Sequence, residues 1–464
     1  MSEPLALSLT PPRPGPPLRV QIRPVAPSLR RFLATEAGGA ALLLGATVVA
    51  LVWANVWPSG YRAFWSTEAG AHVGDGHLDL TLGEWVNDGL MVVFFLVIAL
   101  EIAREVSTGE LRDRRTVAVP ALAALAGLAV PALVFVAFTH GTGDVHGWGA
   151  VMSTDTAFLI GILALFGPRC PDQLRLFLLT LAVVDDIGAI TVMALVYTPS
   201  VHVLPLVVAA VVGAGVLVMR WLGVWQLLPY VAAGIALWFA VHASGVEPTL
   251  AGVVLGLLVP TAAPRRRQVQ DVARFVRLFE LETTAEREHQ AELAARAAVP
   301  VNERLQRALH PWSGFVIVPI FALANAGVRL DSEALQNALH SRVAVGIAIA
   351  LVAGNLVGVF GASFVALRTG VGVLPGRVRY GHLLGGAILC GIGFTISLFV
   401  TDIAFTDEAT KAEAKVGILA GSLVAALLGT AVLRFFGERS SLCSPGVEAL
   451  PAALPPRPWV SPAS

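Results

Sequence analysis

The chain has 464 residues, of which 56% are hydrophobic and only 14% are charged. Soluble domains carry about 25% charged residues, so this composition argues against a soluble globular protein. The 32 basic and 32 acidic residues balance, which gives no reason to expect nucleic acid as a partner. Apolar stretches run through most of the chain, and we therefore predict an all-α polytopic membrane protein.

Apolar runs of about 20 residues mark the candidate membrane spans. We expect about twelve transmembrane helices, of which two, near 227–242 and 246–260, are short. The full set lies near 34–56, 82–103, 117–139, 147–167, 174–197, 203–220, 227–242, 246–260, 308–326, 342–367, 381–401 and 412–436.

Arginines occur in every second loop between these spans. The intervening loops are poor in arginine and often acidic, as at 68–79 and 402–408. The loop that carries Arg329 and Arg342 fits this alternation less well. The positive-inside rule therefore predicts a multi-pass protein of the cell membrane with both termini in the cytoplasm.

Three regions are predicted to lie outside the membrane. Residues 1–31 and 437–464 are rich in proline and are expected to be disordered cytoplasmic tails, which leaves 32–436 as the transmembrane domain. A charged cytoplasmic insertion interrupts that domain at about 261–300. Val269, Val272, Val276 and Phe279 recur there at helical spacing, which predicts an amphipathic helix on the membrane surface, with a solvated charged linker as the alternative.

Acidic residues inside the apolar spans are the strongest functional signal. Asp185 and Asp186 lie in the middle of span 174–197, and Asp155 lies in the span before it. A charge in hydrocarbon costs at least about 2.5–3.5 kcal/mol, so such residues usually face a cavity. Burial and a neighbouring like charge both disfavour the ionised form, so a carboxylate pair can hold protons and release them to a competing cation. Oxygen ligands, including those of Thr154, suit a hard cation such as Na⁺.

The structural alternative for these acids is an ion pair with a buried base. No lysine or arginine occurs in the apolar interior of any span. The sequence therefore favours the exchange of ions over a structural ion pair.

Two spans are interrupted by glycines and small polar residues. One runs from Gly149 to Gly161 and contains a polar run at 153–156, and the other has its glycines between 385 and 393. Such clusters favour an unwound stretch, and a pair of interrupted helices in the two halves of a chain is typical of a transporter's midplane site. Asp155 can offset the positive end of a half-helix there. Close helix packing is the alternative for the second cluster.

Several motifs occur in a fixed order along the chain. They are Leu100-Glu101; Thr154-Asp155 followed by Ala157-Phe158; Ala182 to Ala189 with the aspartate pair; Gly245-Val246 followed by Thr249 to Gly252; Leu309-His310-Pro311-Trp312; Ala324 to Val328; and Leu389 to Thr395. In these residues the chain resembles the NhaA-type sodium/proton antiporters, over roughly residues 32–436.

The resemblance implies about twelve transmembrane helices with inverted repeats and two interrupted, crossed helices. It also implies a transporter that exchanges Na⁺ or Li⁺ for H⁺ across the lipid bilayer by alternating access, serving pH and sodium homeostasis, with no cofactor and no enzymatic activity. It leaves a homodimer open. Asp185 and Asp186 match the exchange site, with Thr154 and Asp155 beside it. The residues that match positions connected with pH response are Glu101, Glu105, Glu247 and Arg304.

The chain departs from the family pattern at a few positions. Asn355 stands where family members generally carry a lysine that can pair with the first aspartate, and Glu247 stands where the family has a histidine. Glu303 and Gln306 change the charges that flank Arg304. Asparagine cannot carry or release a proton, so stoichiometry, voltage dependence and pH profile stay open, and we expect an activity range shifted toward higher pH.

Other kinds of protein fit the sequence less well. A proton-coupled solute symporter needs a larger polar pocket than these few residues suggest. An intramembrane aspartyl protease carries its two aspartates on separate helices, whereas here they are adjacent. A non-transporting relative that has lost the lysine-bearing site is a further alternative. The chain has no GxxxxGK[ST] phosphate loop, which argues against transport driven by ATP.

Overall fold

The computed structural model describes residues 36–73, 76–108, 114–166, 172–197, 202–261, 266–371 and 378–439. The predicted tails fall outside these residues, except that 437–439 belong to the last helix. Ten helices in the described part are long and apolar enough to cross a membrane. The predicted spans near 147–167 and 246–260 correspond to shorter helical segments. The all-α polytopic fold is therefore confirmed.

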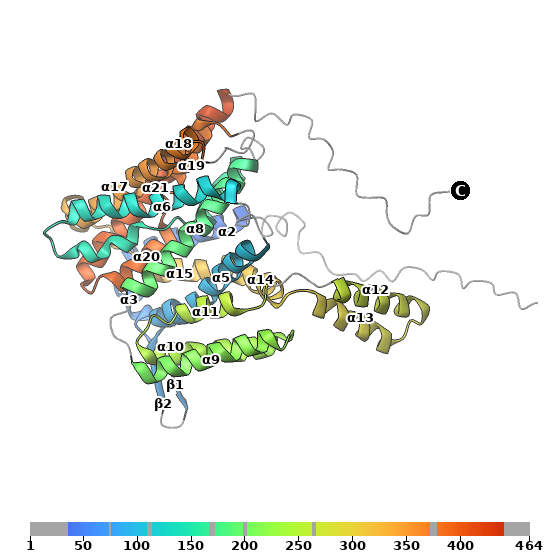
Figure 1. The fold of residues 1–464 in the computed structure, drawn as a ribbon. Helices are drawn as coiled ribbons and strands as arrows, with labels where there is room; N and C mark the ends of the chain where they lie inside the picture. Colours follow the sequence, from blue (N-terminus) through green and yellow to red (C-terminus); the bar gives the residue numbers. More distant parts are fainter. Residues whose placement is uncertain are drawn as a thin grey trace, which may run out of the picture.

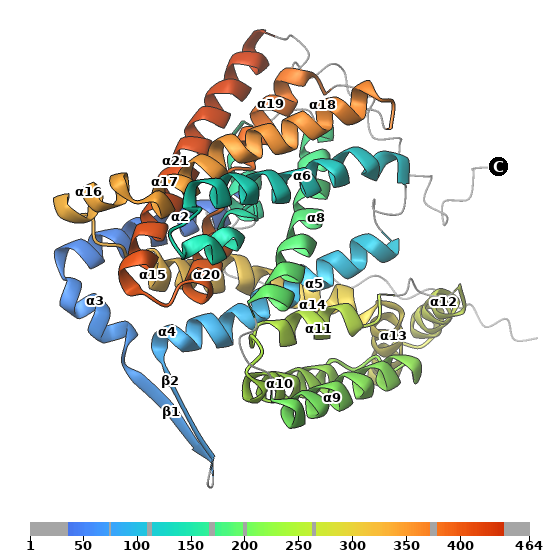
Figure 2. The same cartoon turned by 60° about the vertical axis from the view of Figure 1, so that its left-hand side comes forward.

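The first part of the chain forms one span, a hairpin and a second span. Helices α2 (Glu36–Val56) and α3 (Pro58–Trp65) lead into the antiparallel strands β1 (Glu68–Val73) and β2 (Gly76–Thr81). Segments α4 (Leu82–Glu84), η1 (Trp85–Leu90) and α5 (Met91–Thr108) follow as one continuous span. The hairpin projects from the bundle (Figure 2). Apolar runs do not predict it, because its strands are short and mixed in polarity.

The next segments bring the acidic residues into the bundle. Helix α6 (Arg114–Thr139) is followed by the 3₁₀ helix η3 (Asp144–Val151), by α7 (Thr156–Phe166) and by α8 (Asp172–Val196). The four residues between η3 and α7 are not helical. The predicted interruption of this span is therefore present, at the polar run that the sequence singled out.

The middle of the chain adds three helices to the bundle and two beside it. Helices α9 (Val203–Trp221), α10 (Leu227–Ser244) and α11 (Leu250–Leu258) pack together. The insertion forms α12 (Arg266–Leu281) and α13 (Ala285–Ala298), which pack against each other beside the bundle (Figure 1). The predicted helix thus lies within α12, and its place on a membrane surface stays a prediction.

The last part of the chain contains the second interrupted span. Segments α14 (Val301–Trp312), η5 (Ser313–Ile317) and α15 (Val318–Asn325) form one span, and the short α16 (Ser332–His340) follows it. The next span joins α17 (Arg342–Ile349), the π-helical turns η6 (Ala350–Gly354) and η7 (Leu356–Phe360), and α18 (Gly361–Arg368). Helices α19 (Tyr380–Leu389) and α20 (Phe394–Ala404) are separated by Cys390–Gly393, and α21 (Glu408–Arg439) ends the described chain.

Both interrupted spans lie inside the bundle. The α19–α20 span is the most enclosed, with 94% of its apolar window buried. The ring of Phe399 on α20 lies 5.3 Å from that of Phe95 on α5 and 6.3 Å from that of Phe321 on α15. Aromatic packing therefore joins the second half of this broken helix to the neighbouring spans.

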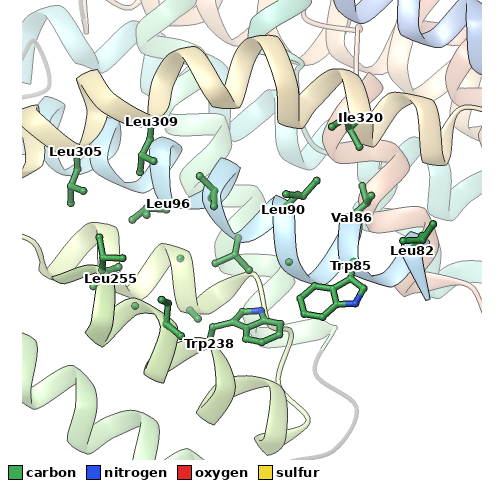
Figure 3. A pocket seen from close by; sticks show the side chains of 18 of the residues that line it. Leu82, Trp85, Val86, Leu90, Leu96, Trp238, Leu255, Leu305, Leu309 and Ile320 are labelled. Atoms are coloured by element: carbon green, nitrogen blue, oxygen red, sulfur yellow. The ribbon is translucent and has the colours of Figure 1, made fainter. Parts of the chain in front are cut away.

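A cavity of about 830 Å³ opens between α5, α10 and the α14–α15 span (Figure 3). Its wall includes the rings of Trp85 and Trp238, whose indole N–H groups already donate to the carbonyls of Ala69 and Asp88. The rest of the wall is mainly aliphatic and aromatic, and none of the described residues that line it is acidic. This cavity is separate from the buried aspartates.

Candidate functional site

Three aspartates are buried where the broken helices meet. Asp185 and Asp186 on α8 are 3% and 7% exposed, and Asp155, which precedes α7, is 5% exposed. Within the described part of the chain, none of the three forms a salt bridge. The carboxyl groups therefore point neither to lipid nor to a guanidinium group.

The aspartate pair reaches the non-helical segment of the first broken span. The backbone N–H of Thr154 donates to Oδ2 of Asp185 at 2.7 Å. The hydroxyl of Ser153 donates a longer bond of 3.4 Å to Oδ1 of Asp186. Adjacent residues on a helix point about 100° apart. Both carboxylates can still accept a hydrogen bond from this segment, because the two donors, Ser153 and Thr154, are consecutive residues of the unwound chain.

The two broken helices cross at their interruptions. The hydroxyl of Thr154 donates to the carbonyl of Cys390 at 2.8 Å, and the backbone N–H of Asp155 donates to the carbonyl of Ile392. Backbone groups in a membrane interior need partners, because no water is there to supply them. Each break supplies partners to the other, and the predicted pair of crossed, interrupted helices is confirmed.

Asp155 lies at the start of two half-helices at once. Its Oδ1 accepts from the backbone N–H of Phe158 in α7 at 3.1 Å. Its Oδ2 accepts from the backbone N–H of Thr395 in α20 at 2.9 Å and also from the hydroxyl of that residue. The first N–H groups of a helix have no partner within the helix and carry a partial positive charge. One carboxylate therefore satisfies the ends of both half-helices.

Asn355 lies on the span that packs behind this crossing. It is 4% exposed, stands between the π-helical turns η6 and η7, and its amide donates to the carbonyl of Leu351 at 3.1 Å. This is a bond within its own helix. The described structure gives Asn355 no hydrogen bond to an aspartate.

The four residues expected to bear on pH response divide into two groups. Glu101 is close enough to Asp186 for their charges to interact, and Glu105 lies 3.4 Å from the guanidinium of Arg104. The amide of Asn302 donates to the carbonyl of Leu100 at 2.9 Å, which brings the start of α14 to this end of α5.

Arg304 follows directly on α14. Its guanidinium donates to the carbonyl of Trp225 at 2.8 Å and lies 5.9 Å from the centre of that indole ring. Glu247 lies elsewhere, near Asp88 and within 3.5 Å of the hydroxyl of Thr249. Since Asp88 precedes α5 and Glu105 is near its end, Glu247 is at the opposite end of this span from the other three.

Two further residues belong to these sites and were not predicted. Thr395 donates to Asp155, and the signal that could have found it is its place two residues after the last glycine of the second cluster. Asp88 is a half-buried acid in an apolar span, so the rule that singled out the aspartate pair applies to it as well.

The chain is similar to known proteins over most of its length. The model of the family described as "Na+/H+ antiporter 1" matches residues 30–433. The protein "Na(+)/H(+) antiporter NhaA 3" of Frankia alni is 59% identical over 453 residues, which cover 97% of this chain and 98% of that protein. "Na(+)/H(+) antiporter NhaA 1" of Acidiphilium cryptum is 43% identical, with 89% of this chain and 93% of that protein covered. The protein of the same description in Mycolicibacterium vanbaalenii is 45% identical over 86% of this chain, which corresponds to 65% of its own length.

Proposed function

Because the chain belongs to the Na⁺/H⁺ antiporter 1 family, we propose that it exchanges Na⁺ for H⁺ across the cell membrane, with Asp185 and Asp186 as the exchange site. One observation carries the assignment of the site. Two adjacent carboxylates, which no basic side chain pairs with among the described residues, are buried in an apolar bundle and meet the polar segment of a broken helix.

Competition between proton and cation explains how such a pair drives exchange. A buried carboxylate without a counter-charge is costly, so the pair is stable when it holds either protons or a cation. The carboxylate oxygens and the Ser153 hydroxyl are oxygen ligands of the kind that suits Na⁺, and Li⁺ by the same chemistry. Binding of one ion releases the other.

Alternating access requires that the neutralised site changes its exposure from one side of the membrane to the other. The contacts of Phe399 with Phe95 and Phe321 are apolar. Such contacts can separate without leaving an unpaired charge or hydrogen-bonding group behind. They support a movement of α20 and its partners relative to α5 and α15 during the cycle.

Asp155 has a different role from the pair. Both of its oxygens accept hydrogen bonds from helix N-termini, so it holds the crossing together while the pair exchanges ions. Thr154 links the two functions, because its backbone N–H contacts Asp185 while its side chain contacts the second broken helix.

Asn355 bears on the number of protons exchanged. A lysine at this place would contribute a proton-carrying ammonium group, and the amide of asparagine cannot do so. We propose that the aspartates alone carry the exchanged protons in this chain.

The remaining assignments concern topology and regulation. The arginine-bearing loops support a cytoplasmic location for both ends of the chain. The position of Glu101 near Asp186 supports a role in pH response through direct electrostatic interaction. Glu247 would influence the pH response in the same way, through its electrostatic interaction with Asp88.

The other candidate functions receive no support from a specific observation. A solute symporter would need a polar pocket at the aspartates, whereas the 830 Å³ cavity is apolar and lies apart from them. A non-transporting relative would have no need of an assembled site, yet Ser153 and Thr154 both donate hydrogen bonds to the aspartate pair.

The test is exchange by the full-length protein in proteoliposomes, read from an internal pH dye on addition of Na⁺. Asp185→Asn and Asp186→Asn should each abolish the signal. The matched control is Asp271→Asn, a change of the same chemistry at an exposed position on α12, which should leave exchange intact. Exchange retained in either pair variant, at normal protein levels, would refute the site.

A further inference from the structure

Tyr197 connects the helix of the aspartate pair to η3, the first half of the first broken span. It follows directly on α8 and is 4% exposed. Its hydroxyl oxygen accepts from the backbone N–H of Gly149 at 2.9 Å, and the same hydroxyl donates to the carbonyl of His146 at 2.6 Å. One side chain thus satisfies two backbone groups of η3.

The packing around this side chain leaves little freedom. A Cβ atom at Gly149 would lie 2.6 Å from the Tyr197 hydroxyl oxygen and 2.6 Å from a ring carbon, so only glycine admits the phenol here. On the other side, the imidazole ring of His146 lies 5.0 Å from the phenol ring in an edge-on arrangement. The phenol is therefore held by two hydrogen bonds and by ring packing.

These contacts attach the broken span to α8 at two places. Tyr197 holds η3 at Gly149, and Asp185 holds the following unwound segment through the backbone N–H of Thr154. Asp185 on α8 and Tyr197 directly after its end lie about 18 Å apart at 1.5 Å per residue. Only the attachment at Asp185 involves an ion-exchanging group, and it must change whenever a proton or a cation binds that carboxylate.

We propose that Tyr197 is a positioning residue for cation binding. It keeps η3 in place on α8, so that Ser153 and Thr154 stay at the correct distance from the aspartate pair when Asp185 changes its bound ion. It touches neither ion. The inference rests on the aspartate pair being the exchange site, and it predicts that Tyr197 sets the affinity for the cation and the discrimination between Na⁺ and Li⁺ rather than the maximal rate.

The decisive variant is Tyr197→Phe, which keeps the ring and removes the hydroxyl. In proteoliposomes with the amount of folded protein matched by gel filtration, the KM for Na⁺ should rise about 3- to 10-fold, the effect of losing one or two net hydrogen bonds. The maximal rate should stay within about twofold, and the ratio of KM values for Na⁺ and Li⁺ should change. Gly149→Ala, which keeps the phenol but forces it away, should act in the same direction, and the double variant should be less than additive.

The matched control is Tyr230→Phe. Tyr230 is also fully buried, and its hydroxyl donates to the carbonyl of Val224 at 3.0 Å in a part of the bundle away from the aspartates. This variant should keep the KM of the parent. If Tyr197→Phe folds poorly, Gly149→Ala decides the question by the same measurement.

The outcomes separate this inference from the proposed function. An unchanged KM for both cations in Tyr197→Phe and Gly149→Ala, together with lost exchange in Asp185→Asn, overturns the positioning role alone. A parallel fall in maximal rate and amount of folded protein without a change in KM also overturns it, since this is the sign of a purely structural residue. Exchange that survives in Asp185→Asn overturns the proposed function itself.

Discussion

Oδ2 of Asp155 accepts a 2.9 Å hydrogen bond from the backbone N–H of Thr395, a residue 240 positions further along the chain. The other oxygen of the same carboxylate accepts from Phe158 at the start of α7. A single side chain therefore joins the second halves of both broken helices, and when ionised it places its charge where two helix N-termini meet.

Asp155→Asn should weaken this junction without changing its size. The amide keeps one acceptor and places a donor against the other helix end, so both the charge and one hydrogen bond are lost. Helix-end interactions of this type contribute about 0.3–2 kcal/mol each, so the variant should be less stable by about 1–3 kcal/mol and should transport more slowly. Thermal unfolding in detergent, followed by tryptophan fluorescence, measures the loss of stability. A variant as stable as the parent would show that the carboxylate is not needed as a shared cap.

The apparent affinity for Na⁺ should depend steeply on pH, because proton and cation compete for the same carboxylates. Where binding of one Na⁺ displaces one proton, the KM for Na⁺ falls about tenfold for each unit of rising pH, and about a hundredfold where two protons are displaced. The KM for Na⁺ no longer changes with pH once the aspartate pair is fully deprotonated. Rates measured over a grid of pH and Na⁺ concentration give the slope. A KM that is independent of pH while the maximal rate varies would contradict direct competition.

Asn355→Lys should shift the active range toward lower pH. A buried ammonium near the aspartates favours their charged form, so they release protons more readily. The side chain is buried and its helix is already distorted by two π-helical turns, a feature often found at functional positions. Asn355→Ala controls for loss of the amide, and it should leave the pH range near that of the parent. An identical pH profile in the lysine variant would mean that this position does not influence the pair.

The ion pair between Lys415 and Asp402 should stabilise the contact between α21 and α20. Nζ of Lys415 lies 2.7 Å from Oδ1 of Asp402, and the two side chains are only 17% and 19% exposed. Removing one partner leaves the other charge poorly solvated, so Lys415→Met should cost about 1–3 kcal/mol, and Lys415→Met combined with Asp402→Asn should cost less than the sum of the single changes.

An exposed ion pair in the same helix provides the comparison. Lys411 lies 2.8 Å from Glu408, and their side chains are 21% and 85% exposed, so water screens the carboxylate, and such surface pairs contribute less than about 1 kcal/mol. Lys411→Met should therefore have the smaller effect in the same unfolding experiment. Equal effects of the two lysine changes would speak against a special role of the partly buried pair.

Local features of the chain were predictable, and contacts between distant segments were not. The apolar runs locate the spans, and the glycine clusters locate both interruptions, because each signal lies within about twenty residues. Hydrophobic periodicity carries no information on which segments meet, so the bond from Thr154 to Cys390 required the three-dimensional structure. For the same reason a lone tyrosine at a helix end, Tyr197, gave no signal, although its hydroxyl binds two backbone groups of another segment.

The length of chain between Asp155 and Thr395 has a consequence for biosynthesis. At 5–20 residues per second, the ribosome needs about 12–48 s to complete the intervening 240 residues. During this interval the first half of the protein is already in the translocation machinery or the bilayer while its later partner has not been made. The nascent Asp155 must therefore remain protonated, hydrated or shielded until α20 arrives. Folding of the amino-terminal half into its final form is thus completed only after nearly the whole polypeptide has been translated.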